Sequence, residues 1–176
     1  MRPWAVPITV TAYDPHWPLR FEAERAELDR LLTPWLVDGV HHIGSTAIPG
    51  LSAKPILDMM AGVRDLSAAR AAIPVLEARG YRHAPHRPEA LWFHKPQDDE
   101  LAARTHQLHL TEPGSALWRE RLTFRDALRT DTALRDEYQE LKLRLAGAHG
   151  DDIKAYTADK RAFVTRVLAM HGVTLG

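Results

Sequence analysis

Two hydrophobic patterns succeed each other along the chain. Short β-branched and aromatic runs bounded by Gly or Pro are typical of strands, whereas apolar residues three and four positions apart indicate helices. By these criteria, strands or extended segments are expected over residues 7–14, 38–44, 55–63, 81–84, 90–96 and 105–112. Helices are expected over residues 17–35, 66–80, 114–130, 131–150 and 151–172.

The order of these segments predicts a mixed α/β (α+β) fold. A sheet of about four or five strands with flanking helices would be followed by a C-terminal helical portion. The polar loop 97–104 joins two expected strands and favours their antiparallel pairing. Pro74 predicts a kink or an early break in helix 66–80. We expect residues 1–112 to form the core and residues 113–176 to pack on it as part of one structural domain.

The charge balance limits the classes of partner. The chain has 23 basic and 23 acidic residues, a formal net charge of zero, and 45% hydrophobic residues. Broad binding to nucleic acid requires a basic face, so this composition argues against it. A small pocket with local positive charge remains compatible with the same total.

Cysteine content and hydropathy indicate the compartment. The chain contains no cysteine, which excludes disulfides and thiolate metal ligands and favours a reducing environment. Its first residues carry no apolar segment typical of a signal peptide, and no run reaches the length needed to span a bilayer. We therefore expect a cytoplasmic protein with no membrane partner.

One carboxylate interrupts the apolar run PILDMMAGV at residues 55–63. In a strand, Asp58 shares a face with Ile56 and Met60. A buried ionised carboxylate is costly unless it is paired, hydrogen-bonded or bound to a metal. Asp58 could therefore cap a neighbouring backbone or pair with an arginine, or it could be a metal-binding or catalytic carboxylate at the bottom of a cleft.

The turn before this strand offers a possible anion site. Gly44, Ser45 and Thr46 follow the expected strand 38–44, where a glycine lets the backbone approach a ligand and exposed N–H groups favour phosphate. A Gly-Ser turn is also common for purely structural reasons. The P-loop pattern GxxxxGK[ST] is absent from the chain.

The segment HIGSTAIPGLSAKPILDMMAGV resembles the diagnostic segment of the GrpB family, a group of predicted nucleotidyltransferases of the DNA polymerase β-like superfamily. Further segments resemble GrpB blocks in the expected order, namely AYDPHWPLRFEAE, THQLHL, LTFRDALR, EYQELK and YTADKRAFV. The resemblance thus covers nearly the whole chain and implies a nucleotidyltransferase-like sheet.

The resemblance also implies roles for particular residues. Gly44 and Ser45, with Thr46 beside them, would hold the oxygens of a triphosphate, and Asp58 would be the catalytic carboxylate that binds Mg²⁺. The superfamily normally has a second acid two residues further on, where this chain has Met60. A thioether is a poor ligand for a hard cation. Either another residue replaces the missing acid, or the site binds a nucleotide without the usual chemistry.

Histidines on the following strands are candidate substitutes. His109, together with His94, could join Asp58 in a site better suited to Zn²⁺ or Mn²⁺ than to a pair of Mg²⁺ ions. Alternatively, both are polar strand residues with satisfied hydrogen bonds. Metal-dependent hydrolysis at such a site is a third functional possibility.

Basic residues could neutralise a bound anion. Lys54 precedes the Asp58 strand, while Lys160 and Tyr156 lie on the apolar stripe of the last helix and Arg125 lies on the first of the three C-terminal helices. Lys160 could instead extend its ammonium to solvent, and Arg125 could be a solvated or paired surface residue. The resemblance favours all four as pocket residues.

Besides metal-dependent hydrolysis at the histidines, two functions remain open at this stage. The first is metal-dependent transfer of a nucleotidyl group from an NTP to a small-molecule acceptor, with Mg²⁺, Mn²⁺ or Zn²⁺. The second is a non-catalytic module that binds a nucleotide or phosphorylated metabolite. The resemblance links this second function to coenzyme A metabolism, because some GrpB proteins are fused to dephospho-CoA kinase.

Overall fold

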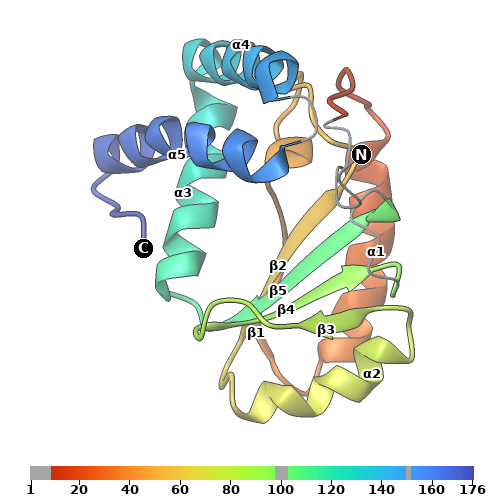
Figure 1. Cartoon of the computed structure of the whole chain (residues 1–176). Helices are drawn as coiled ribbons and strands as arrows, with labels where there is room; N and C mark the ends of the chain where they lie inside the picture. The colour runs from red at the N-terminus through yellow and green to blue at the C-terminus, as the bar shows by residue number, and fades with distance from the viewer. Residues whose placement is uncertain (1–8, 98–102, 150–151) are drawn as a thin grey trace.

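The computed structural model describes residues 9–97, 103–149 and 152–176 (Figure 1). The helices are α1 (Trp17–Leu32), α2 (Ile73–Glu77), α3 (Ala116–Thr130), α4 (Thr132–His149) and α5 (Ile153–Met170), with short 3₁₀ turns η1 (Ser45–Ala47) and η2 (Ala68–Ala72). The strands are β1 (Leu36–Ile43), β2 (Leu57–Val63), β3 (Arg82–Ala84), β4 (Ala90–Lys95) and β5 (His106–Thr111).

The strands form one mixed sheet in the order β1-β2-β5-β4-β3. Only β2 and β5 are parallel among these neighbours, and the expected antiparallel pairing of β4 with β5 is confirmed. In register, Asp58 lies opposite Ile43 of β1 and opposite Gln107 of β5. The predicted α+β class is confirmed, and its central strands carry the residues singled out from the sequence.

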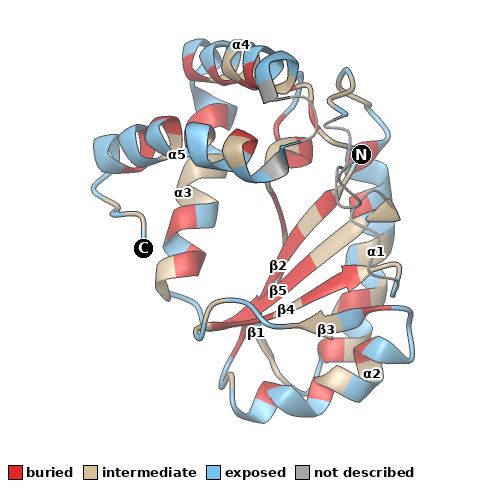
Figure 2. Cartoon of the chain, viewed as in Figure 1, coloured by how far each residue is buried: buried red, intermediate tan, exposed pale blue. Residues whose placement is uncertain are grey.

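One face of the sheet packs against α1 and α2. Met59 and Ala61 of β2 belong to a buried cluster that also contains Leu28 of α1 and Leu76 of α2. Burial is concentrated in the three inner strands β2, β5 and β4 (Figure 2). This cluster is the main core of the sheet, and it leaves Asp58 on the opposite face.

The opposite face receives the start of α3. Leu117 and Trp118 pack on Ile43 and Met60. Gly62 lets the indole approach, since a Cβ there would lie 3.0 Å from the ring of Trp118. The α3 helix therefore starts against the sheet and then runs away from it along one side of the Asp58 strand.

The three C-terminal helices share a second core with the loop that follows β1. Ile48 and Leu51 of that loop are buried against Leu128 of α3, Tyr138 of α4 and Phe163 of α5. The helices are thus fastened to the segment that carries the glycine–serine turn. The division of the chain near residue 112 remains a prediction.

The expected helix over residues 66–80 is broken where Pro74 predicted. The chain forms η2 and then the short α2, with Pro74 in the first turn of α2. Proline has no N–H and a fixed φ, so the first turn of a helix accommodates it without loss of a hydrogen bond.

The expected strand over residues 7–14 begins outside the described residues. Within residues 9–14, Thr11 forms a single bridge with Ala53, with N···O distances of 2.9 and 3.0 Å in the two directions. This segment is an extended arm rather than a strand of the sheet.

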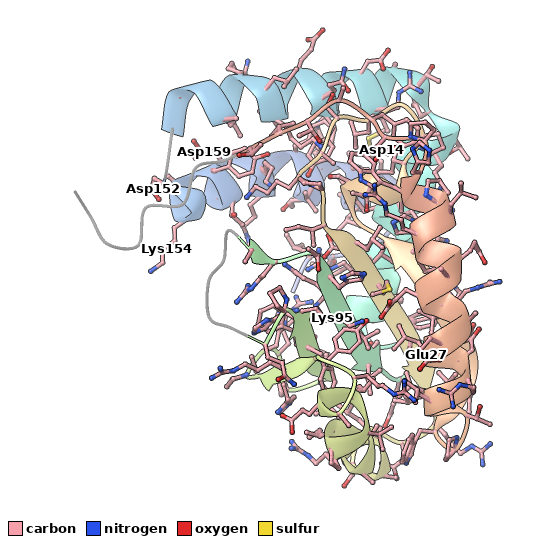
Figure 3. All side chains as sticks on the ribbon, turned by 90° about the vertical axis from the view of Figure 1, so that its right-hand side faces the viewer. Asp14, Glu27, Lys95, Asp152, Lys154 and Asp159 are labelled. Carbon is pink, nitrogen blue, oxygen red and sulfur yellow. The ribbon has the colours of Figure 1, made fainter. Side chains whose placement is uncertain are left out.

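Charged side chains of both signs are spread over the outside of the molecule. Figure 3 shows Glu27 on the outer side of α1, and Asp152 and Lys154 at the start of α5. In the described part of the chain, no helix combines the length and apolar character needed to cross a membrane.

Candidate functional site

The glycine–serine turn and Asp58 are in direct contact. Gly44 adopts φ +70°, and a Cβ at this position would lie 2.5 Å from Oδ2 of Asp58. Only glycine allows both the positive φ and this close approach. The sequence predicted that these two residues serve one site, and the structure places them side by side.

Both residues line a cleft of about 770 Å³. The turn and β2 form one wall, while side chains of α3 and α5 form the other. Its charged lining residues are Asp58, Arg87, Glu120, Arg121, Lys154, Lys160 and Arg161, which are five bases and two acids. A chain with no net charge therefore contains a locally positive cleft of the size that binds small molecules.

Asp58 is a carboxylate without a counter-ion in contact. It is partly exposed, and within the described residues no hydrogen bond or ion pair holds its oxygens. Burial raises its pKa to about 6, and the charges of Arg121, Lys160 and Lys54 oppose this rise. Such a group can bind a cation or accept a proton near neutral pH.

Tyr156 brings two lysines toward Asp58. Its ring is buried, with the Nζ of Lys160 at 4.3 Å and that of Lys54 at 5.1 Å from the ring centroid. Burial, together with the charge of Lys54, lowers the pKa of Lys160 to about 8. The aromatic face thus holds two cations in a partly dehydrated position, where an anionic ligand would be attracted strongly.

Lys142 of α4 contacts the turn from behind. Its side chain is 2% exposed, and its Nζ donates hydrogen bonds to Ser45 Oγ at 3.2 Å and to the Ser52 carbonyl. Because an ammonium can only donate, Ser45 accepts this bond, and its hydroxyl also hydrogen-bonds the buried Tyr138. Burial and the charge of Lys160 lower the pKa of Lys142 to about 7.

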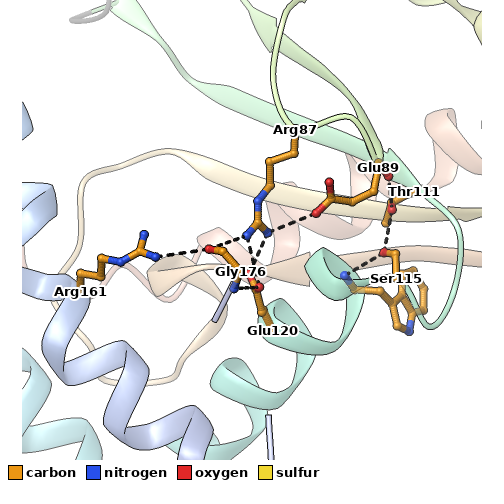
Figure 4. A network of polar contacts seen from close by, with 8 residues as sticks. Arg87, Glu89, Thr111, Ser115, Glu120, Arg161 and Gly176 are labelled. Atoms are coloured by element: carbon orange, nitrogen blue, oxygen red, sulfur yellow. Dashed lines mark hydrogen bonds and ion pairs between the residues drawn. The ribbon is translucent and has the colours of Figure 1, made fainter. Parts of the chain in front are cut away.

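An ion pair forms the far wall of the cleft. Arg87 donates to both carboxylate oxygens of the buried Glu120, at 2.8 and 3.2 Å. Figure 4 shows that Arg87 and Arg161 also converge on the carbonyl of Gly176. Since Glu120 is neutralised by Arg87, Asp58 is the lining carboxylate that lacks an ion-pair partner in the described part of the cleft.

The structure does not bring the proposed histidine ligands to Asp58. His94 lies on β4, two strands from Asp58 and so roughly 10 Å away. His109 is buried beside Met60, outside the cleft, where burial and Arg121 lower its pKa to about 3. In the described ranges, no three His, Asp or Glu side chains form a group that could hold a metal ion.

Met60 itself is a core residue. It is fully buried between Ile43 and Trp118 and contributes no atom to the cleft. In register, His109 lies opposite Met60, whereas Gln107 lies opposite Asp58 and does not line the cleft. One carboxylate does not fit a resident two-metal centre, but it does fit a Mg²⁺ ion that retains waters and phosphate oxygens as ligands.

Two other predicted pocket residues face away from this cleft. The Thr46 hydroxyl is buried, donates to the Ile56 carbonyl at 3.0 Å, and lies 2.9 Å from His42 Nε2. Arg125 donates to the His42 carbonyl and lines a second cleft behind the turn. Their positions oppose a direct role at Asp58.

The sequence analysis missed several residues of the site. Lys142 and Tyr138 lie in the segment EYQELK, which belongs to the resemblance to the GrpB family. The helical pattern did not predict that the Lys142 side chain faces the interior. Arg87 lies in the segment between β3 and β4 and meets Glu120 only through tertiary packing. No local pattern distinguishes these residues from surface charges.

Comparison with known proteins decides the family. Residues 7–170 match the protein family described as GrpB protein. The chain belongs to the GrpB family. A UPF0157 protein of Deinococcus radiodurans is 38% identical over 152 residues, which cover 86% of this chain and 76% of that protein. The UPF0157 protein BH1888 of Halalkalibacterium halodurans is 31% identical over 99% of this chain and 87% of that protein.

Solved structures agree with this family and fold. The crystal structure of the conserved protein GrpB from Enterococcus faecalis has a TM-score of 0.83 at 31% identity, with coverage of 92% of this chain and 96% of that one. The Cid1 poly(U) polymerase bound to Mg 3′-dATP has a TM-score of 0.55 at 12% identity, over 85% of this chain and 49% of that one. The GrpB chain therefore has a nucleotidyltransferase-like fold, although this likeness by itself does not identify its reaction.

Some relatives are longer than this chain. The UPF0157 protein YqkA of Bacillus subtilis is 33% identical over 89% of this GrpB chain, but the match spans only 45% of YqkA. A dephospho-CoA kinase of Mycolicibacterium paratuberculosis is 29% identical over 88% of this chain and 43% of that protein.

Proposed function

We propose that this GrpB protein binds an NTP with Mg²⁺ in the Asp58 cleft and transfers its nucleotidyl group to a small-molecule acceptor. The observation that carries the proposal is the contact between the free Asp58 carboxylate and the Gly44 turn, inside a cleft with excess positive charge. A Mg²⁺–nucleotide complex has a cation and a polyphosphate. The carboxylate of Asp58 suits the cation, and the Gly44 turn with the basic residues of the cleft suits the polyphosphate.

The chain's own residues would divide the work as follows. The Ser45 hydroxyl, held by Lys142, donates to a phosphate oxygen, and Lys160 and Lys54 neutralise the negative charge. Asp58 would hold Mg²⁺, or Mn²⁺ in its place, and the ion would supply positive charge to the phosphate oxygens. The histidines do not reach this position, so a Zn²⁺ site is not part of the proposal.

Transfer of the nucleotidyl group requires only the NTP and the acceptor as reactants. An acceptor oxygen bonds to the α-phosphorus, the bond from this phosphorus to the bridging oxygen breaks, and pyrophosphate leaves. The acceptor proton passes to solvent water, because Asp58 would be occupied as the metal ligand. A cytoplasmic location belongs to the same proposal, because the chain has no cysteine.

A second function is favoured by the burial of Met60. With one carboxylate at the metal position, the same cleft would bind a nucleotide or phosphorylated metabolite without turnover. The match to part of a dephospho-CoA kinase suggests that such a module would assist coenzyme A metabolism. Coenzyme A and its precursors carry the nucleotide and phosphate groups that the cleft would recognise.

A thermal-shift and calorimetry series separates these functions. Each NTP and coenzyme A is titrated with Mg²⁺, with Mn²⁺ and without metal, against the wild type and Asp58→Asn. Stabilisation should follow RT ln(1 + [L]/Kd). Metal-dependent NTP binding that Asp58→Asn abolishes, with pyrophosphate release in the presence of acceptors, supports transfer. Binding that needs neither metal nor Asp58 supports the non-catalytic module, and no binding of any of these ligands refutes both.

A further inference from the structure

Behind the glycine–serine turn lies a second cleft of about 390 Å³, separate from the Asp58 cleft and sharing none of its lining residues. It lies between α1, β1 and α3. Its charged residues are Arg25, Arg125, Arg129 and Glu22, and its histidines are His41 and His42. We propose that this second cleft binds a small anion that carries a phosphate group.

The charges of this cleft are only partly neutralised from within. Glu22 pairs with Arg25 at 2.9 Å, and Arg125 pairs with Asp126 at 2.7 Å. Arg129 uses its Nε to bond the Ala47 carbonyl at 2.8 Å and has no ion pair among the described residues. Its guanidinium therefore keeps its terminal N–H groups available for a bidentate contact with an oxyanion.

Two arginines of α3, Arg125 and Arg129, lie close together although their positive charges repel each other. Arg125 and Arg129 are four residues apart, so they lie on the same face of the helix. Burial and the neighbouring Arg125 lower the pKa of Arg129, which reports the unfavourable proximity of the two cations. A like-charge pair at this spacing destabilises a helix, and an anion between the guanidiniums would reverse that effect.

His42 is a neutral part of the wall at the same place, and its Nε2–H is already donated to Thr46 Oγ1. It is buried, stacks on Phe21 with ring centroids 4.6 Å apart, and burial with the two arginines lowers its pKa to about 4. The cleft is therefore charged by its guanidiniums and not by its imidazoles near neutral pH. Its size is at the small end of ligand sites, which suits a phosphate, a diphosphate or a small phosphate ester better than a polymer.

The position of this site connects it to the Asp58 cleft. Ala47, whose carbonyl Arg129 holds, belongs to the same short turn η1 as Ser45. An anion on Arg129 would thus contact the back of the segment whose front faces Asp58.

The test is a two-dimensional ¹H–¹⁵N NMR titration of the 19.8 kDa chain. Inorganic phosphate, pyrophosphate and glycerol 3-phosphate are added separately, with KCl at equal ionic strength as the blank. Saturable shifts of the amides of His42, Ala47 and Arg129 are expected. The ligand whose shifts saturate at the lowest concentration shows whether the cleft prefers free phosphate or a phosphate ester.

Variants assign the shifts to this cleft. Arg129→Gln and Arg125→Gln should each weaken the apparent affinity by roughly fivefold or more. Arg119→Gln, an exposed arginine of the same helix outside both clefts, should leave it unchanged. The remaining spectrum of each variant verifies its fold.

A Lys160→Gln variant separates this inference from the proposed function. The shifts at Ala47 and Arg129 should persist in it, even if all binding in the Asp58 cleft is lost. Shifts that KCl reproduces, shifts confined to residues of the Asp58 cleft, or an Arg129→Gln variant with unchanged affinity would each overturn the proposal.

Discussion

The carboxylate of Asp58 rests against the Cα of Gly44, with Oδ2 2.5 Å from the point that a Cβ would occupy. The two residues are fourteen positions apart in the chain, and they meet because β1 and β2 pair with Ile43 opposite Asp58. This contact creates a place where a metal-binding carboxylate and a phosphate-binding turn can act on one ligand.

Replacing Gly44 with alanine tests this contact. The positive φ costs roughly 1–2 kcal/mol for a residue with a Cβ, and the collision with Asp58 adds to that cost. We expect Gly44→Ala to lose more than about 2 kcal/mol of unfolding free energy in urea titrations. Gly80→Ala is the matched control, because Gly80 has φ +86° with open space around its Cα. Equal losses in the two variants would show that the contact with Asp58 is unimportant.

Asp58 should make stability depend on pH in an identifiable window. Its folded pKa of about 6 lies above the ordinary 3.8, so the folded state holds the proton more firmly. The unfolded chain therefore releases this proton first as the pH rises, and stability is lost between about pH 4 and 6. Asp58→Asn removes this loss. We expect the variant to be more stable than the wild type at pH 8, by an amount of order 1–3 kcal/mol, and similar at pH 4.

Chemical denaturation at several pH values measures this difference, and a variant that is less stable at pH 8 contradicts the free carboxylate. The affinity for a Mg²⁺–nucleotide complex should change in the opposite sense. It should rise as the pH increases through about 6, because only the ionised carboxylate binds the cation.

Lys142 should affect both the pH dependence of the unfolding free energy and the binding of a ligand. Its folded pKa of about 7 lies below the ordinary 10.5, so stability is present above the unfolded pKa and is lost as the pH falls toward 7. Lys142→Met should flatten the rise of unfolding free energy between about pH 7 and 9, where one such group contributes up to roughly 1.4 kcal/mol per pH unit. Lys154→Met, at an exposed lysine, is the control for the loss of one positive charge.

The same variant should weaken phosphate binding at the turn. Without the ammonium, Ser45 loses the bond that orients its hydroxyl. Ser45→Ala should weaken nucleotide binding to a similar extent without altering the pH slope of stability. If Lys142→Met retains full affinity while Ser45→Ala does not, the lysine has no positioning role.

Arg87→Ala should destabilise the wall of the cleft. Glu120 is 4% exposed, and removal of Arg87 would leave its charge buried without a partner. A loss of about 2–4 kcal/mol is expected in equilibrium unfolding. Arg79→Ala provides the comparison, because its pair with Glu27 is open to solvent and contributes little. Similar losses in the two variants would contradict the importance of burial.

Much of the fold could be read from local patterns. The alternation of apolar segments and the Gly and Pro signals located all five strands of the sheet within a few residues, and Pro74 marked a real break. Asp58 was identifiable because a carboxylate in an apolar strand requires an explanation. Gly44 was identifiable because the end of a strand is followed by a residue that permits positive φ.

The partners of these residues were not predictable in the same way. His109 and Asp58 are both polar residues on the same face of the sheet, yet the register places Gln107 beside Asp58 and leaves His109 buried next to Met60. A shift of two residues along a strand keeps the face and changes the neighbour, and no local signal specifies it. Helical spacing placed Arg125 and Lys160 on inward-facing arcs, but it could not say into which cleft each one points.

The sequence by itself determined the class of fold, the family and the two residues at the centre of the candidate site. It could do so because strand and turn signals are local, and because a carboxylate within an apolar run is unusual wherever it occurs. Only the tertiary structure decided which cations surround Asp58, that Lys142 contacts Ser45 from a helix almost a hundred residues away, and that a second basic cleft lies behind the same turn. Those contacts depend on strand register and helix packing, which arise from the whole chain and not from any single segment.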